Sequence, residues 1–329
     1  MNDEKISEAK FDWSKPMFKN NRYENPSGTF PKGFKDLFKW VVLEKRAKWQ
    51  KKISSKSTAQ LKTKLEADQF NCVMVNHASL LIQLPEGNLL TDPVFSQRTS
   101  PFQWIGPSRH QAPGLKLQEL PPIHFVLVSH NHYDHMDMDS LRSLWKEHDP
   151  VFLLPLHNSR FLRDSGIHSQ KIQELNWWES CRLGDNFRAV LTPAQHWSFR
   201  SHKDRNHSLW GGFWIDNGKS KIFFAGDTGC SNHFDQIREP LGTPNLSLLP
   251  IGAYEPRWFM KEQHMNPEDA VKAHLDLESQ YSVAIHWGTW QLTNEGMEDP
   301  VKALGIALNQ YQVSPEKFRV LGNGEIFFL

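Results

Sequence analysis

Four potential metal ligands stand close together in one short loop of this sequence. His130, His132, Asp134 and His135 follow directly on the apolar run 125–128. On an extended chain His130 and His132 fall on the same side, and Asp134 and His135 can address a second position once the chain bends. Imidazole and carboxylate ligands together favour zinc, with iron or manganese as the alternatives. A histidine-rich loop has little structural use after a buried strand, so we interpret this loop as a metal site.

Three further segments show the same arrangement, in which an apolar strand ends at a ligand. The ligands are His196, Asp227 and His286. Taken singly, a histidine at a strand end is more often a hydrogen-bonded residue of the core or its rim. Together with the loop, however, they make five histidines and two aspartates. That is too many ligands for one tetrahedral zinc, and it suits two metals that share a carboxylate and a hydroxide.

Short runs typical of strands must carry these ligands. They occur from residue 71 onward, at 72–75, 79–84, 88–91, 125–129, 151–154, 188–191, 209–215, 221–225, 246–250 and 283–286, with helical patterns at 139–148, 267–277 and 300–311. The helix at Pro267 is well signalled, because Asn266 can cap it while Glu268 and Asp269 complement its dipole. Strands mixed with helices predict a layered αβ domain over 71–329, with sheets covered by helices.

Residues 212–220 resemble a phosphate-binding loop, but five residues separate Gly212 from Gly218 where that motif has four. Asp216, Asn217 and Gly218 lie between two apolar runs, which indicates a hairpin. We therefore predict a β-turn here and no nucleotide site.

The net charge hides an uneven distribution. The 329 residues include 38 Lys and Arg against 37 Asp and Glu, a formal charge of +1, which argues against a nucleic-acid-binding protein. Between Lys32 and Lys64, however, eleven basic residues stand against two acids, so this segment carries +9. Apolar residues from Phe34 to Ile53 recur there at near-helical spacing. Such a helix could lie on an anionic membrane, or it could dock its apolar face on the domain.

The composition also bears on location. No apolar run approaches the roughly 18 residues that a spanning helix needs, and residues 1–13 show no signal for secretion. The three cysteines, Cys72, Cys181 and Cys230, are too scattered for a disulfide framework. We therefore expect a cytoplasmic protein. Its organisation would be an N-terminal arm with a basic amphipathic helix over residues 1–70, followed by the layered αβ domain over 71–329.

The ligand pattern resembles that of the metallo-β-lactamase superfamily, and more closely its N-acylphosphatidylethanolamine-hydrolysing phospholipase D branch. The motifs that carry the likeness are Arg22-Tyr23-x-Asn25-Pro26 and the segments 91–96, 100–102, 129–135, 195–197, 223–229, 250–260 and 285–289. The uninterrupted string at 250–260 is far more specific than the metal loop. One departure surrounds His77, where Asn76 and Ser79 stand in place of the usual Gly and Thr.

This resemblance implies an α/β fold, an αββα sandwich with an N-terminal extension and with the site at one edge of the two sheets. Two zinc ions per chain are implied, one held by His130, His132 and His196, the other by Asp134, His135 and His286, with Asp227 bridging them. Behind these ligands stand His77 and Asp92, and Asp92 would orient a ligand imidazole. For Asp92, a turn carboxylate before Pro93 is the alternative.

The resemblance further implies a phospholipase D reaction, in which N-acylphosphatidylethanolamine or a related phospholipid yields an N-acylethanolamine and phosphatidic acid. We assign catalysis to Asp134, Asp227 and His264, and substrate contact to Tyr133, Gln263 and His264. A surface pair before the helix is the alternative for Gln263 and His264. Four tryptophans lie beside the proposed ligands and could wall an acyl-chain cavity, although tryptophan is more often a core residue. They are Trp197, Trp258, Trp287 and Trp290.

Two other functions stay open, because fold and metals do not determine the substrate. The centre could hydrolyse another phosphodiester or a lactone, or the protein could bind lipid without catalysis. The partners that we expect are a phospholipid, a peripheral membrane surface and, from the family, a second copy of the chain in a homodimer. No nucleic acid is expected.

Overall fold

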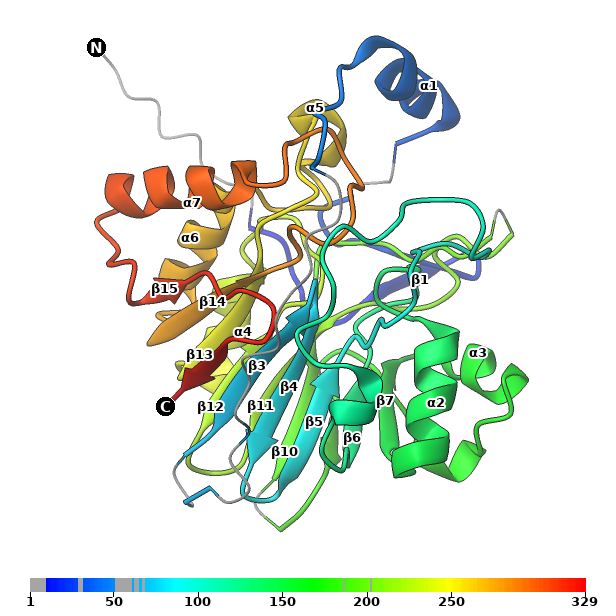
Figure 1. Ribbon diagram of the computed structural model, residues 1–329, viewed down its shortest axis with the longest axis vertical. Coiled ribbons are helices and arrows are strands. Elements are labelled where there is room, and N and C mark those ends of the chain that lie inside the picture. Colours follow the sequence, from blue (N-terminus) through cyan, green and yellow to red (C-terminus); the bar gives the residue numbers. More distant parts are fainter. Residues whose placement is uncertain are drawn as a thin grey trace.

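Two β-sheets stacked face to face form the body of the molecule. The computed structural model describes residues 10–28, 32–50, 61, 65–66, 69–185, 187–201 and 203–329. Within these residues each sheet has seven strands, and helices cover the outer faces (Figure 1). The architecture is therefore the αββα sandwich that the sequence predicts.

The first sheet mixes antiparallel and parallel pairs. In spatial order its strands are β16 (Ile326–Phe328), β3 (Asn71–Asn76), β4 (Ser79–Leu84), β5 (Gly87–Thr91), β6 (Phe125–Leu127), β7 (Val151–Pro155) and β8 (Ile172–Leu175). The second sheet consists of β15 (Phe318–Arg319), β14 (Tyr281–Ile285), β13 (Leu246–Pro250), β12 (Lys221–Phe224), β11 (Gly212–Asp216), β10 (Arg188–Thr192) and β9 (Ser180–Arg182). A separate hairpin pairs β1 (Met17–Lys19) with β2 (Arg22–Glu24).

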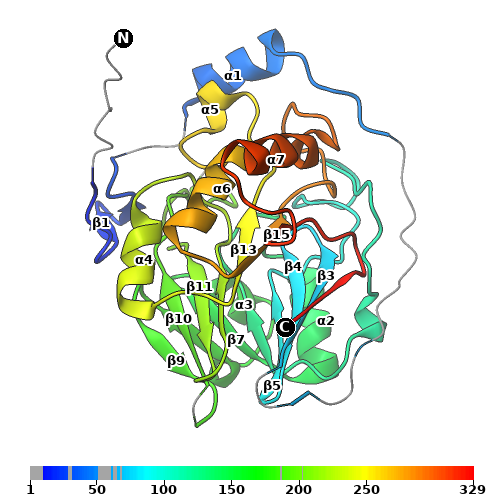
Figure 2. The same cartoon turned by 90° about the vertical axis from the view of Figure 1, so that its left-hand side faces the viewer.

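Helices pack on both outer faces. On the second sheet lie α4 (His233–Leu241), α6 (Pro267–Asp276) and α7 (Asp299–Gln310), and on the first lie α2 (Met138–His148) and α3 (Ser159–Asp164). Two short 3-10 turns cover Leu117–Glu119 and Ser169–Lys171. At one end of the sandwich α1 (Phe34–Leu43) lies beside α5 (Arg257–Met260) (Figure 2).

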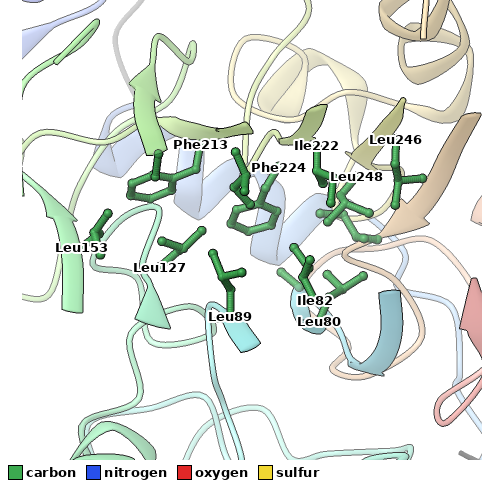
Figure 3. Close-up of a cluster of buried hydrophobic side chains, with 14 of the residues drawn as sticks. Leu80, Ile82, Leu89, Leu127, Leu153, Phe213, Ile222, Phe224, Leu246 and Leu248 are labelled. Atoms are coloured by element: carbon green, nitrogen blue, oxygen red, sulfur yellow. The ribbon is translucent and has the colours of Figure 1, made fainter. Parts of the chain in front are cut away.

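The main core lies between the two sheets. Figure 3 shows side chains from both layers pointing toward one another, among them Leu80, Ile82, Leu89, Leu127 and Leu153 from the first sheet and Phe213, Ile222, Phe224, Leu246 and Leu248 from the second. Central strands such as β4 and β13 are buried along their whole length, because helices cover their other face. This explains why these strands are nearly continuous apolar runs and do not alternate between apolar and polar residues.

The predicted signals of α6 are confirmed. Asn266 accepts a hydrogen bond from the amide of Asp269, the Asp269 carboxylate accepts one from the amide of Asn266, and Pro267 occupies the first turn. The hairpin is also confirmed, since Asp216 pairs with Lys221 and the Asn217 side chain accepts from the amide of Ser220.

Some predicted boundaries were wrong. The run 209–215 begins as a strand only at Gly212, because residues 209–211 cross between layers. The edge strands β8, β9, β15 and β16 were not predicted. They are two to four residues long and partly exposed, so no apolar run marks them.

The basic helix is shorter than its spacing predicts. Helix α1 ends at Leu43, and residues 45–50 are not helical. The reason is long-range pairing: the amide of Ala47 donates to the carbonyl of Asn294, and the Trp49 indole donates to the carbonyl of Glu295. Ile53 and the basic residues at 51, 52, 56, 62 and 64 lie outside the described residues. Among the helices that the structure describes, none has both the length and the apolar composition needed to cross a membrane.

The N-terminal residues pack into the body of the molecule. Trp13 is fully buried and belongs to the core cluster between the sheets, together with Tyr23. Side chains of Asn232 and Gln236 bind the main chain of Phe11 and Trp13. The domain boundary at residues 70 and 71 stays a prediction.

Candidate metal centre

Four strands bring the predicted ligands to one end of the sandwich. The loop 130–135 follows β6, whereas His196, Asp227 and His286 follow β10, β12 and β14. The pairing makes β12, β13 and β14 parallel, and β10 is antiparallel to β11, which is antiparallel to β12. The carboxyl ends of β10, β12 and β14 therefore meet at the same edge, and the loop after β6 faces them across the two layers.

The first cluster combines three imidazoles with one carboxylate. His132 Nδ1 lies 2.9 Å from His130 Nε2 and 3.2 Å from His196 Nε2. Asp227 Oδ2 is 3.9 Å from His130 Nε2 and 3.8 Å from His196 Nε2. These four residues can each offer a ligand atom within one small sphere.

The second cluster shares that carboxylate. Asp134 Oδ2 is 3.5 Å from His135 Nε2 and 3.3 Å from His286 Nε2. Asp227 Oδ2 lies 3.2 Å from each of the same two nitrogens. Asp227 thus contacts both clusters, which is the arrangement that the sequence predicts for a bridging ligand.

The donor set fits divalent metal ions. Histidine nitrogens and carboxylate oxygens are their usual ligands, and these side chains are buried except that of His132, which is partly buried. Buried Asp227 Oδ1 and His132 Nε2 have no hydrogen-bond partner among the described residues. Buried polar atoms are normally paired, so their isolation indicates that this site is built for cations.

The two clusters differ in their electrostatics. Burial, reinforced by neighbouring histidines, lowers the pKa of His130 far below its usual value. Burial also opposes a charge on His286, but the Asp227 and Asp134 carboxylates outweigh it and raise its pKa to about 9. The carboxylates raise the pKa of His135 in the same way. The second cluster therefore holds protons that a metal must displace.

A single carboxylate, that of Asp92, orients one histidine of each cluster. Asp92 Oδ2 accepts a hydrogen bond of 2.6 Å from His135 Nδ1 and one of 2.6 Å from the Ser129 hydroxyl. The Ser129 oxygen in turn lies 2.9 Å from His130 Nδ1 and accepts from it. Both imidazoles consequently turn their Nε2 atoms toward the clusters. The Ser79 hydroxyl, which the usual Thr would also supply, donates to the carbonyl of Asp92.

His77 lies against the second cluster. Its Nε2 is 3.2 Å from Asp134 Oδ2, and burial lowers its pKa to about 3. The neutral ring therefore donates to the Asp134 carboxylate. Trp290 packs on the far side of the ring, with centroids 5.0 Å apart.

A cavity of about 480 Å³ opens over the clusters. The predicted substrate contacts Tyr133, Gln263 and His264 all line it, together with His132, Asp134 and Asp227. The main-chain carbonyl of Gln263 also accepts a hydrogen bond from His196 Nδ1. His264 Nδ1 lies 3.8 Å from Asp227 Oδ2, and burial lowers the pKa of His264 to about 4. The Tyr133 hydroxyl donates to the carbonyl of Arg200.

Of the four tryptophans that could wall the cavity, one lines it and three do not. Trp197 lines the cavity. Trp287 and Trp290 lie behind the ligands, in a narrow space beside His77, because the chain turns away from the cavity after His286. Trp258 is partly exposed on α5, where its indole donates to Glu44.

Residues that sequence reasoning missed complete the wall. They are Leu37 and Trp40 of α1 with Phe199, Phe259, Met260, Leu292 and, at the mouth, Arg205. Glu295 was also missed. Its buried carboxylate accepts from the amides of Ala253, Tyr254 and Glu255 and so holds the string 250–260 in place. No local pattern marks these residues, since their partners are distant in sequence.

Residues 87–287 match the family described as a β-lactamase superfamily domain. The chain belongs to the metallo-β-lactamase superfamily. It is 35% identical to N-acyl-phosphatidylethanolamine-hydrolyzing phospholipase D 1 of Caenorhabditis elegans, over 85% of this chain and 84% of that protein. This places it in the phospholipase D-like branch that the motifs predict.

Two further likenesses agree with this assignment. The yeast protein N-acyl-phosphatidylethanolamine-hydrolyzing phospholipase D, mitochondrial, from Saccharomyces cerevisiae, is 36% identical over 66% of this chain and 47% of its own length. A metallo hydrolase from the archaeon Ignicoccus hospitalis has the same fold, with a TM-score of 0.59 at 19% identity over 79% of this chain and 98% of that one. This member of the superfamily is thus a metal-dependent hydrolase.

Proposed function

We propose that this hydrolase cleaves N-acylphosphatidylethanolamine or a related phospholipid in a two-zinc reaction of phospholipase D type. The observation that carries the proposal is the cavity, because it joins the His and Asp clusters at its floor to an apolar wall of Trp40, Trp197 and Phe259. Such a site suits a substrate with a phosphodiester at one end and acyl chains at the other. The names of the relatives support the same substrate class.

The proposed ligand roles follow the two clusters. His130, His132 and His196 would hold one ion, Asp134, His135 and His286 the other, and Asp227 would bridge them. Two ions held there would lower the pKa of an attacking water and neutralise charge on the phosphate oxygens. Zinc is our choice for this mixture of imidazole and carboxylate, and iron or manganese would use the same residues.

Other side chains would bind the reacting group. Water oxygen attacks phosphorus, the bond from phosphorus to the ethanolamine oxygen breaks, and the leaving oxygen takes up a proton. We assign the contact with this region to His264 and Gln263, which lie beside Asp227 on the cavity wall. Arg205, whose guanidinium stacks 5.1 Å from the Trp197 ring, stands at the mouth, where it can attract an anionic headgroup. Tyr133 forms the opposite wall, held by Arg200 over its ring.

Membrane contact is the second part of the proposal. Helix α1 exposes Leu37, Phe38, Val42 and Leu43 beside the cavity mouth. The loop that follows Thr99 exposes Phe102, Trp104 and Ile105, and Trp104 is 75% exposed. Lys35 and Lys39 belong to α1, and Lys32, Lys45 and Arg46 flank it in the sequence. Apolar side chains with nearby cationic ones favour an anionic lipid surface.

Substrate competition tests the reaction. The zinc-loaded protein is incubated with N-acylphosphatidylethanolamine vesicles, a soluble phosphodiester and a sugar lactone. We expect N-acylethanolamine and phosphatidic acid to form in equal amounts, with oxygen from labelled water in the phosphatidic acid. Faster turnover of a soluble substrate would assign another hydrolase activity. Lipid binding with no turnover by the metal-loaded protein would indicate a non-catalytic lipid-binding protein.

Sedimentation tests the membrane contact. The protein should sediment with anionic vesicles at low salt and less with neutral ones. Absence of binding to both would contradict a peripheral membrane role. Light scattering of the purified protein without vesicles tests the homodimer.

A further inference from the structure

Asn25 connects the N-terminal segment to a metal ligand. It follows β2, and its side chain is buried, with 3% exposed. Its Nδ2 donates to the carbonyl of His196 at 2.9 Å, and the amide of His196 donates to its Oδ1 at 3.2 Å. One side chain thus satisfies both main-chain groups of a residue that is 171 positions away.

His196 lacks support from a sheet. Strand β10 ends at Thr192, and residues 193–199 belong to no strand or helix. In the part of the chain that the structure describes, no main-chain group pairs with the amide or carbonyl of His196. Without Asn25, two buried main-chain groups would lose the bonds described here, and an unsatisfied buried polar group destabilises the position that its residue holds.

A second asparagine holds the same region. The amide of Tyr23 donates to the carbonyl of Asn206, and Asn206 Nδ2 donates to the carbonyl of Tyr23. The amide of Ser198 donates to Asn206 Oδ1. The hairpin of β1 and β2 is therefore fastened to both ends of the segment 196–198.

Asn25 and Gln263 set different features of His196. The Gln263 carbonyl accepts from His196 Nδ1 and determines how the ring is turned. Asn25 determines where the main chain lies, and hence how far Nε2 reaches toward His132 and Asp227. Trp197, the next residue, packs against the His132 ring and lines the cavity.

We infer that Asn25 is a positioning residue for the first metal cluster, so that the N-terminal segment completes a site whose ligands all lie within residues 87–287. The inference rests on the proposed two-metal centre, and it does not depend on the substrate. Asn25 touches no reacting atom. It acts through the main chain of His196.

Zinc titration of the metal-free full chain against a chromophoric chelator tests this role. The wild-type protein should bind two Zn²⁺ ions. Asn25→Ala should weaken one of them by about 10–100-fold, as loss of a ligand-supporting contact does, and leave the other unchanged. Asn25→Asp keeps an acceptor for the His196 amide and loses the donor, so we expect a smaller loss and a folded protein. Tyr23→Phe is the matched control on the same strand, and both affinities should stay at the wild-type values.

Hydrogen exchange of the metal-free protein gives a second readout. Asn25→Ala should speed exchange in peptides covering residues 193–199 and leave those of β13 unchanged. Equal weakening of both zinc ions, or no weakening of either, would overturn the inference. A wild-type protein that does not bind two ions would instead contradict the proposed metal centre, and the exchange comparison would still decide whether Asn25 holds this segment.

Discussion

The floor and the rim of the cavity are built in different ways. On the floor, the candidate ligand side chains are buried, with His132 partly buried, and several are held by a further contact, such as Asp92 to His135 and Gln263 to His196. On the rim, α1 exposes four apolar side chains and is fastened at few points. Trp40 donates to Asn294 and packs 4.9 Å from the Phe259 ring. The comparison teaches that the candidate metal ligands are held at strand ends in the core, whereas the surface that we propose for lipid contact belongs to an appended helix.

The largest expected effect comes from breaking the floor at its shared ligand. Asp227→Asn should reduce turnover by more than the roughly 100-fold that loss of a supporting contact costs, because both clusters lose a ligand. Metal analysis should find fewer ions per chain, while circular dichroism shows the same fold. Turnover within about ten-fold of the wild-type rate would contradict a bridging role for Asp227.

A smaller loss of metal affinity or turnover is expected when Asp92, which supports the ligands, is changed. Asp92→Asn keeps the side-chain volume but weakens the acceptor for His135 Nδ1 and the Ser129 hydroxyl. We expect metal affinity or kcat to fall about 10–100-fold. The measurement is zinc affinity together with kcat and KM. Unchanged metal affinity and kcat would show that Asp92 serves only the turn before Pro93.

A substitution on the rim should lower the rate of turnover only when the substrate is in a membrane. Phe38, which is 62% exposed on α1, should reach the bilayer, where burial of a Phe is worth about 1.5–3 kcal/mol. Phe38→Asp should therefore lower the rate on anionic vesicles by about ten-fold or more, with no change on a dispersed short-chain lipid. Ile306→Asp on α7, where Ile306 is 69% exposed, is the matched control. Equal losses in both assays would assign Phe38 to the fold.

The smallest effect concerns how the free energy of unfolding depends on pH through His233, which lies below the metal centre. His233 is fully buried between Trp13 and Thr228, and burial lowers its pKa to about 3 from 6.5. The folded state binds this proton more weakly than the unfolded chain. Its contribution to stability is therefore complete above pH 6.5 and falls as the pH drops toward 3, by about 2 kcal/mol at pH 5.

Denaturant unfolding of the metal-free protein at several pH values checks this expectation. Glutamine does not titrate, so the free energy of unfolding of His233→Gln should fall less between pH 7 and pH 5 than that of the wild-type protein. The expected difference is the roughly 2 kcal/mol given above. Identical pH dependence of the two proteins would show that His233 does not titrate as its burial predicts.

Much of the site could be predicted because each ligand follows a recognisable strand. The run before His130 and the string before Asp227 are apolar, short and buried, so each marks a strand that ends at a candidate ligand. These strands, β6 and β12, belong to different sheets, and their carboxyl ends face each other across the two layers. The α6 cap was equally local, since Asn266 and Asp269 are three residues apart. The wall of the cavity could not be predicted in this way. Trp287 and Trp290 are close to His286 in sequence, yet the turn that follows His286 carries them behind the metal site.

The sequence by itself determined the layered fold, the choice of seven candidate ligands and the charge split between a basic segment and the rest of the chain. These follow from local rules, in which apolar periodicity defines strands and ligand types define chemistry. Only the tertiary structure decided which distant residues support those ligands. Asn25 with His196, Glu295 with Ala253 and Trp40 with Phe259 are contacts between segments that share no local pattern. Their pairing depends on how two sheets stack and where loops meet, because side-chain hydrogen bonds and packing act over a few ångströms whatever the separation along the chain.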